Sequence, residues 1–312
     1  MKQPKALVLF SGGLDSRLVI KILQEQNIEL EAVFIKLPFG EGCCNNTACI
    51  FNYSQVQGIK LHIIDATKEP LFSEYLEMIK KPKHGYGVSL NPCKDCKVFI
   101  LKKAKELGEK INADFLATGE VLAQRPNSQY KSHLMLIERK ADLVGKILRP
   151  LSAKLLPETI AEKNHLVERE KLLSIQGRQR KKQLELAKKY KIKYPAPAGG
   201  CLLCEKEYCR KLKDILATDG LKYEDILLLG VGRHFRSKET NNKIIIGKNE
   251  NENKELELIN QNIKYNILVP KKVPGPTVIF KDEKDKELAE ELLNAYSSKD
   301  KSLVKKFQVM RI

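Results

Sequence analysis

The segment Ser11–Ser16, Ser-Gly-Gly-Leu-Asp-Ser, constrains the fold of this chain more than any other stretch. It follows an apolar run over 6–10, which predicts a buried strand, and precedes apolar residues at helical spacing over 17–23. Gly12 and Gly13 permit a sharp turn and a close approach of the backbone to a ligand. Because helix N-termini favour anions and two serine hydroxyls are present, the segment predicts a phosphate-binding loop rather than an ordinary strand-to-helix turn.

The length and hydropathy of the chain set broad limits. Its 312 residues are enough for two domains, and 42% hydrophobic with 30% charged residues is typical of soluble globular proteins. No apolar run reaches the length of a membrane span, and the chain enters its first predicted strand almost at once, without room for a signal peptide. We therefore expect a cytoplasmic protein with no membrane partner.

The charge balance favours a polyanionic partner. The chain has 56 basic and 39 acidic residues, a net charge of +17. Nucleic acid suits this excess better than a membrane, because no basic amphipathic anchor stands out. The alternative is a lysine-rich surface that serves solubility alone.

Strands alternate with helices in the first two-thirds of the chain. Residues 30–36, 60–65 and 115–118 predict further strands, so the fold class is α/β with a doubly wound parallel sheet. Ligands of such sheets bind at the carboxyl ends of the strands, where Ser11 lies. We also expect short strands around 133–137 and 145–151, and a basic helix that opens at Gly177.

The composition changes after about residue 210. We predict a first domain over 1–210 and a smaller α+β domain over 211–312. In this second part we expect helices over 207–218 and 287–296, and strands over 227–236, 243–249, 265–270 and 277–280.

Eight cysteines are few for a disulfide scaffold of this length, so ligands or reactive thiols are expected. Cys93 and Cys96 follow Pro92 and share the first turn of a predicted helix, a place that favours thiolate. Such a pair can hold zinc, form a redox dithiol or ligate an iron–sulfur cluster. Cys201 lies in a later loop rich in Pro and Gly, which indicates a positioned thiol.

The Ser-Gly-Gly-Leu-Asp-Ser segment resembles the pyrophosphate loop (PP-loop) of ATP pyrophosphatases, whose domains are similar to adenine nucleotide alpha hydrolases. This resemblance implies that ATP is split between its α and β phosphates, with Mg²⁺ present. The residues that it implies for binding ATP are Ser11, Gly12, Gly13, Asp15, Ser16, Phe34, Lys36, Thr118 and Gly119, of which Asp15 is also implied in catalysis.

The order PP-loop, Asn-Pro-x-x-x-Cys, Ala-Thr-Gly and late loop cysteine resembles the tRNA thiolation enzymes, above all the 2-thiouridine synthases. That resemblance implies a catalytic pair of Cys96 and Cys201. With Cys93, the set also resembles the iron–sulfur-dependent tRNA thiolases, in which three cysteines hold a [4Fe-4S] cluster. The chain departs from these families at Leu14, where valine is usual, and at Glu120, where histidine is usual. No RNA-binding domain precedes the loop, unlike in the 4-thiouridine synthases.

The last hundred residues resemble the RNA-binding domain of NFACT-type proteins in the motifs Gly-Arg-His-Phe-Arg and Gly-Lys-Asn-x-x-Glu-Asn. That resemblance implies that Arg233, His234, Arg236 and Lys248 face phosphate; ordinary turn chemistry and surface charge are the alternative. In the first domain, Arg178 and Arg180 open the basic helix, for which an RNA contact and a solvated face are both open.

Together these resemblances imply an ATP-dependent tRNA sulfurtransferase supplied with sulfur by sulfide or a persulfide carrier. Four alternatives stay open: a persulfide enzyme without a cluster, a zinc site of Cys93, Cys96, Cys201 and Cys204, a zinc enzyme similar to 7-cyano-7-deazaguanine synthases, and a non-catalytic RNA-binding factor. The sequence assigns no role to Cys43, Cys44, Cys49, Cys204 and Cys209.

Overall fold

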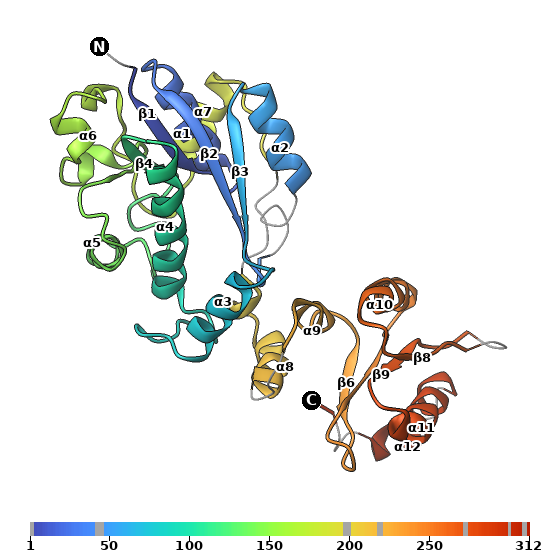
Figure 1. Ribbon diagram of the computed structural model, residues 1–312. Coiled ribbons are helices and arrows are strands. Elements are labelled where there is room, and N and C mark those ends of the chain that lie inside the picture. The colour runs from blue at the N-terminus through green and yellow to red at the C-terminus, as the bar shows by residue number, and fades with distance from the viewer. Residues whose placement is uncertain are drawn as a thin grey trace. The chain divides into compact units, whose positions relative to one another are not determined.

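The computed structural model describes residues 3–40, 47–195, 201–216, 221–270, 274–298, 301–307 and 311–312, in two compact units, Met1–Cys204 and Glu205–Ile312 (Figure 1). Cys43, Cys44, Gly199 and Gly200 lie outside the described residues, as does the end of the helix predicted over 207–218. Within the described ranges, we find no helix with the length and apolar character that crossing a membrane requires.

The first unit is built on a five-stranded sheet. Its elements are β1 Lys5–Leu9, α1 Leu14–Gln24, β2 Glu29–Lys36, α2 Thr47–Val56, β3 Lys60–Asp65, α3 Leu71–Lys80, α4 Cys93–Lys110, β4 Phe115–Thr118, α5 Lys131–Lys140, β5 Ile147–Leu148, α6 Ile160–Lys163 and α7 Lys181–Lys189. The strand order is β3-β2-β1-β4-β5, and each pair is parallel. The predicted doubly wound parallel sheet is confirmed.

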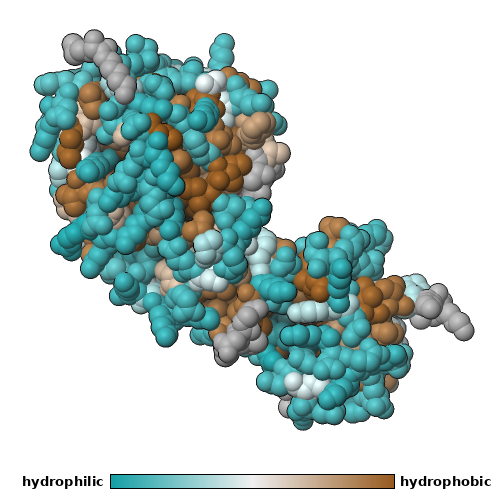
Figure 2. Space-filling model, in the orientation of Figure 1, coloured by the Kyte–Doolittle hydropathy of each residue, from teal (hydrophilic) through white to brown (hydrophobic). Residues whose placement is uncertain are grey.

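Helices cover both faces of this sheet (Figure 1). On one face α1, α2 and α7 enclose a large core that contains Ala6, Val8 and Phe34. On the other face α4 and α5 pack over Leu7, Val33 and Leu116. Figure 2 shows a mostly hydrophilic surface on this unit, with apolar side chains gathered over the side of the sheet formed by β2 and β3.

The second unit has a four-stranded antiparallel sheet in the order β6-β7-β9-β8. Its elements are α8 Lys206–Leu216, α9 Tyr223–Leu228, β6 Arg233–Arg236, β7 Lys243–Ile246, α10 Glu250–Ile263, β8 Asn266–Leu268, β9 Val278–Phe280, α11 Lys286–Ser297 and α12 Lys301–Lys306. Because strand side chains alternate between faces, Ile244 and Ile246 pack with α11, whereas Ile245 packs with α9 and α10. The predicted smaller α+β fold is confirmed.

Three sequence predictions of secondary structure are wrong. Residues 133–137 lie in α5, where Leu134 and Ile137 are buried at helical rather than strand spacing, whereas the short strand expected around 145–151 is confirmed as β5. The basic helix begins at Lys181 instead of Gly177. The leucine run at 227–229 is the end of α9 rather than the start of a strand.

Candidate functional site

The predicted phosphate-binding loop follows β1, the strand at which the order of the strands in the sheet changes direction. From β1 the chain continues to β2 and β3 on one side and returns through β4 and β5 on the other. Leu9 pairs with Thr118 in parallel register, so the residues after the two strands, 10–13 and 119–120, share one edge of the sheet. Open α/β sheets bind their ligands at such a switch point.

Two glycines shape this loop. Gly12 has a φ of +78°, and a Cβ there would lie 2.8 Å from Cγ1 of Ile50. Gly119 approaches α1 so closely that its Cβ would lie 2.8 Å from the amide nitrogen of Ser16. Gly13 is the N-cap of α1 and supplies no capping side chain. The first amides of α1 therefore have no N-cap side chain to satisfy them, which suits an anion.

Asp15 is held by glutamines that sequence reasoning missed. Gln124 Nε2 donates to Asp15 Oδ2 at 3.0 Å, and Gln183 Nε2 from α7 donates to Gln124 Oε1 at 3.4 Å. The second oxygen of Asp15, Oδ1, is buried and has no hydrogen-bond partner among the described residues. A carboxylate oxygen in this position fits a Mg²⁺ ion, which prefers such ligands.

Arg17 is a second residue that the sequence did not single out. Its side chain is buried, its Nε donates to the Gly12 carbonyl at 2.7 Å, and its guanidinium lies 4.2 Å from the centre of the Tyr53 ring. It also donates to the Lys193 carbonyl at 2.8 Å and to Cys49 Sγ at 3.3 Å. Arg17 thus fixes the loop backbone to α2 and to the segment after α7. The only sequence signal was a charged residue inside an apolar helical pattern.

Among the other residues implied for nucleotide binding, three side chains are buried or already paired with another residue, and one is exposed. The Phe34 side chain is 3% exposed and belongs to the core, so its side chain offers little surface to a nucleotide. The Thr118 hydroxyl is buried and donates to Glu120 at 3.3 Å. Lys36, at the end of β2, pairs with Asp65 at 3.7 Å. Ser11 is exposed, and its hydroxyl lies 3.4 Å from that of Ser16.

The predicted cysteine set gathers around one tyrosine. Cys93 and Cys96 occupy the first turn of α4, as predicted, and Cys96 Sγ lies 3.3 Å from the hydroxyl of the fully buried Tyr75. Asn91 Nδ2 donates to Cys93 Sγ at 3.3 Å. Cys201 lies near the C-terminal end of this unit in the sequence. Its backbone forms an isolated β-bridge with Gly40, a residue that follows β2. Burial raises the pKa of Tyr75 most, and charge on each of the three thiols raises it further.

Burial has the largest effect on the pKa values of Cys96 and Cys201. It raises the pKa of Cys96, although the Tyr75 hydroxyl and Lys97 oppose it, and it raises the pKa of Cys201 to about 12. Negative charge on Cys96, Cys204 and Cys93 raises the pKa of Cys201 further. The expectation that the helix N-terminus leaves Cys96 with a lowered pKa is therefore wrong, because desolvation outweighs it.

An ion pair links the cysteines to the loop. Lys97, next to Cys96, lies 3.2 Å from Glu120, and Glu120 directly follows Gly119, which packs on the first turn of α1. Arg149 is buried and binds Glu120 at 3.1 Å and also Glu138. Burial favours a raised pKa for Glu120, but Lys97 and Arg149 lower it to about 2, so its carboxylate is ionised. This network gives a reason for glutamate at the position where histidine is usual.

The cysteines do not converge on one point. Within the ranges that the structure describes, no three His, Cys, Asp or Glu side chains form a group that could hold a metal ion. The single zinc ion considered for Cys93, Cys96, Cys201 and Cys204 is thus not supported. A [4Fe-4S] cluster needs a different arrangement, because each thiolate binds a separate iron. Cys93, Cys96 and Cys201 are thiols of the type that such a cluster binds.

The basic residues predicted for RNA contact differ in exposure. In the first unit Arg178 is exposed and Arg180, the N-cap of α7, is half-buried. The helix that follows packs on α1 through Gln183 and Ala187, and it exposes four lysines. These are Lys181, Lys182, Lys188 and Lys189.

The Gly-Arg-His-Phe-Arg motif of the second unit is mostly structural. His234 is 1% exposed and its Nε2 lies 2.9 Å from the Val231 carbonyl, so the prediction that it faces phosphate is wrong. Arg236 Nε donates to Asp214 at 3.0 Å, and Arg233 lies 5.1 Å from the centre of the Tyr296 ring. Lys248 is exposed, with Glu252 at 3.5 Å.

Comparison with known proteins matches each unit to a family. Residues 4–158 match the tRNA methyl transferase HUP domain, and residues 232–310 match the NFACT protein RNA binding domain. The first unit is thus similar to the HUP domain of that family and the second to the NFACT RNA binding domain, which agrees with the two resemblances seen in the sequence.

Among individual proteins, the chain is similar to tRNA-specific 2-thiouridylase MnmA. It is 27% identical to the Nitratiruptor protein over 156 residues, 47% of this chain and 45% of that protein. It is 31% identical to the Sulfurimonas denitrificans protein over 128 residues, 38% of this chain and 35% of that protein. The chain thus spans less than half the length of these relatives. A solved structure, U34-tRNA thiolase NcsA from Methanococcus maripaludis with its [4Fe-4S] cluster, is 19% identical over 74% of this chain and 72% of its own, with a TM-score of 0.38.

Proposed function

We propose that this chain is an ATP-dependent tRNA sulfurtransferase that replaces a uridine carbonyl oxygen with sulfur. The observation that carries the proposal is the series of contacts that connects the cysteine set to the helix after the PP-loop. Cys96 is followed by Lys97, Lys97 pairs with Glu120, and Glu120 follows the glycine that packs on the first turn of α1. A nucleotide bound at α1 and a sulfur carrier at the cysteines would then be neighbours.

Activation of the uridine is assigned to the loop. The carbonyl oxygen attacks the α-phosphorus of ATP, the bond to the bridging oxygen breaks, and pyrophosphate leaves. The amides after Gly13 would bind the pyrophosphate, and Asp15 Oδ1 would hold a Mg²⁺ ion, which would supply positive charge to offset that of the phosphates. Lys97 is partly exposed and pairs with Glu120, the residue after Gly119, and it is proposed to neutralise charge that develops on the phosphates. Sulfur then attacks the activated carbon, and AMP departs with the original oxygen.

Cys93, Cys96 and Cys201 are proposed as ligands of a [4Fe-4S] cluster. Three protein thiolates would leave one iron open for sulfide, and this is the chemistry that the cluster supplies. The Tyr75 hydroxyl, 3.3 Å from Cys96 Sγ, would donate to a ligating sulfur and hold its position. Cys204 is exposed and is assigned no ligand role.

A persulfide on Cys201, resolved by Cys96 as a disulfide, is the second candidate. The same neighbourhood of the two thiols favours it, since negative charge on Cys96 acts on the pKa of Cys201. The two schemes differ over Cys93, which only the cluster needs.

The test uses protein purified without oxygen, unmodified tRNA, Mg-ATP and sulfide, with mass spectrometry of the nucleosides. Thiouridine should form with the wild type and Cys204→Ala, and should be lost with Cys93→Ala, Cys96→Ala and Cys201→Ala together with about four irons per chain. Thiouridine formed by an iron-free wild type that is supplied with a persulfide donor in place of sulfide would replace the cluster scheme with the persulfide scheme. Absence of thiouridine with a fully loaded protein would refute the proposed function.

A further inference from the structure

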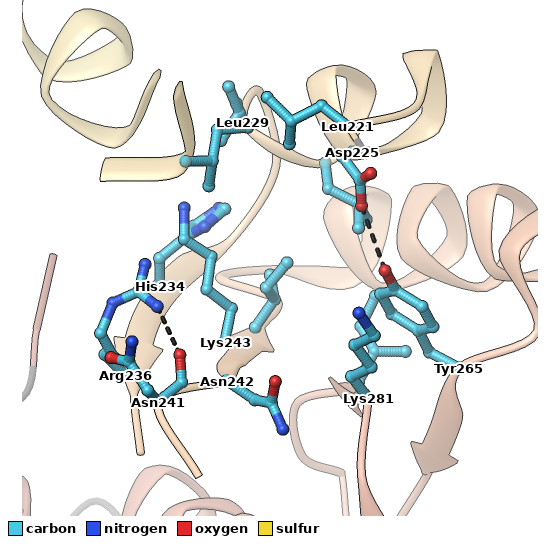
Figure 3. Close-up of a pocket in the computed structure, with 14 residues that line it drawn as sticks. Leu221, Asp225, Leu229, His234, Arg236, Asn241, Asn242, Lys243, Tyr265 and Lys281 are labelled. Carbon is cyan, nitrogen blue, oxygen red and sulfur yellow. Dashed lines mark hydrogen bonds between the residues drawn. The ribbon is translucent and has the colours of Figure 1, made fainter. Parts of the chain in front are cut away.

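The second unit contains a hollow that the proposed sulfur chemistry does not use. Its volume is about 140 Å³, and the residues that line it come from α8, α9, β6, β7, β9 and the loops between them (Figure 3). Its deepest apolar members are Leu229, Ile245 and Ile279, each less than 5% exposed. The residues at its opening are polar or charged, with Lys281 alongside Tyr265.

The size and lining of the hollow fit one flat ring. An apolar cavity of about 150 Å³ accepts benzene, so a six-membered ring fits within this hollow, whereas a two-ring system would extend out of its opening. Tyr265 adds an aromatic face, and its hydroxyl donates to Asp225 Oδ1 at 3.1 Å. A ring that is apolar on its faces and polar at its edge therefore suits this surface better than an aliphatic chain.

An acceptor in the lining selects for a ring that donates hydrogen bonds. His234 is neutral, because burial and the nearby lysines 211 and 243 keep its pKa well below the usual value. Its Nε2 lies 2.9 Å from the Val231 carbonyl and its Nδ1 is buried, so His234 forms part of the wall and offers no accessible acceptor. The carboxylate of Asp225, which also lines the hollow, is an acceptor that a ring can reach. The imide N–H of uracil and the exocyclic amine of cytosine are donors of the required kind.

The charge at the opening suits a phosphate attached to that ring. Arg236 and Lys243 both bind Asp214, Lys243 at 2.8 Å, so that carboxylate offsets part of their charge. Lys281 is exposed and pairs with no acidic group in the described part of the chain. It is therefore the cation most available to a ligand.

Several residues that line the hollow come before the segment of the sequence that matches the NFACT family. The NFACT match begins at residue 232, whereas Leu221, Asp225 and Leu229 lie on α9 or beside it. The hollow thus depends on the segment that this chain places before the RNA-binding domain.

We propose that the hollow binds one unpaired pyrimidine nucleotide of RNA, with the base on the apolar floor beside Tyr265 and a phosphate at Lys281. Such insertion of an unstacked base is the common mode of sequence-dependent RNA recognition. The inference deepens the RNA partner of the proposed function, but it requires no ATP, sulfur or cluster.

The test measures binding of the full chain, without ATP, to fluorescein-labelled octamers U8, C8 and A8 and to an octamer of the same charge that lacks bases. A stacked base contributes enough that U8 or C8 should bind about tenfold more tightly than the abasic octamer. A8 should gain less. Equal affinity for U8 and the abasic octamer, or A8 binding as tightly as U8, would overturn the inference. Free UMP that binds more tightly than U8 would also overturn it, since a mononucleotide would then be the ligand.

Variants locate the effect. Leu221→Trp fills the hollow and should remove the pyrimidine advantage while the affinity for the abasic octamer is kept; an advantage that persists in the folded variant contradicts the proposal. Lys281→Ala should weaken the binding of every octamer, and it should reduce the slope of log affinity against log salt concentration by about one. Lys284→Ala changes an exposed lysine outside the hollow and should have neither effect. Equal effects of the two lysines would contradict the assignment. If no octamer binds at all, the proposed RNA partner of this unit fails with it; binding without base preference removes only the inference.

Discussion

Replacing Glu120 with glutamine should destabilise the first unit in a pH-dependent way. Glu120 is 5% exposed, and Lys97 and Arg149 lower its pKa from 4.5 to about 2 against the effect of burial. A lowered pKa means that folding favours the ionised form, so the stabilisation is complete above the unfolded pKa of 4.5 and is lost as the pH falls toward about 2.

The size of the effect follows from this difference in pKa. At about 1.4 kcal/mol for each pH unit, the carboxylate contributes about 3 kcal/mol at pH 7 and about 1 kcal/mol at pH 3. Glu120→Gln keeps the shape of the side chain but removes the charge, so the free energy of unfolding should fall by about 3 kcal/mol at pH 7, and the gap to the wild type should narrow in acid.

Urea unfolding at several pH values, followed by circular dichroism, measures this difference. Glu170→Gln is the matched control, because its ion pair with Lys154 is on the surface and the Glu170 side chain is 92% exposed. It should change the unfolding midpoint little. Equal stability of Glu120→Gln and the wild type at pH 7, or a gap that stays constant down to pH 3, would refute the view that this buried network holds the loop to the cysteines.

Three further outcomes are expected. Asp15→Asn should abolish tRNA-dependent release of pyrophosphate while the melting temperature stays near that of the wild type, since it removes a charge from the proposed Mg²⁺ site; normal turnover would refute that role. Gly119→Ala should cost about 1–3 kcal/mol of stability and lower pyrophosphate release, because its Cβ would lie 2.8 Å from the Ser16 amide, whereas Gly230→Ala meets its nearest atom at 3.6 Å and should be tolerated. Lys182→Glu with Lys189→Glu should weaken tRNA binding and reduce its salt slope by about two, and Lys110→Glu, an exposed lysine on α4, should not; equal effects would argue against α7 as an RNA contact.

The sequence predicted the sheet of the first unit well because its signals are local. Short apolar runs bounded by turns mark β1, β2 and β4, and paired glycines mark the loop. The same reasoning failed for α5 and for the end of α9, where short apolar runs are equally compatible with a helix. Packing against the sheet decides in favour of the helix in both places. This packing cannot be seen in the local sequence pattern.

The candidate site was predicted in its chemistry but not in its connections. The cysteines and Asp15 are conspicuous as residue types in special local contexts. The pairing of Lys97 with Glu120, and of Gln124 with Asp15, joins residues far apart in the chain and has no local signature. The sequence also does not show which side chains of a motif are buried. His234 stands in a basic motif that indicates phosphate binding, yet it packs inside the domain.

The most direct test of the account is the stoichiometry of one reaction. Unmodified tRNA, Mg-ATP and sulfide are incubated without oxygen with the loaded protein, and AMP, ADP and thiouridine are measured in the same sample. Adenylation of the uridine oxygen requires one AMP for each thiouridine, with no ADP. Thiouridine formed without ATP, ADP as the product, or AMP released with no thiouridine would contradict the mechanism proposed for the PP-loop and its neighbouring cysteines.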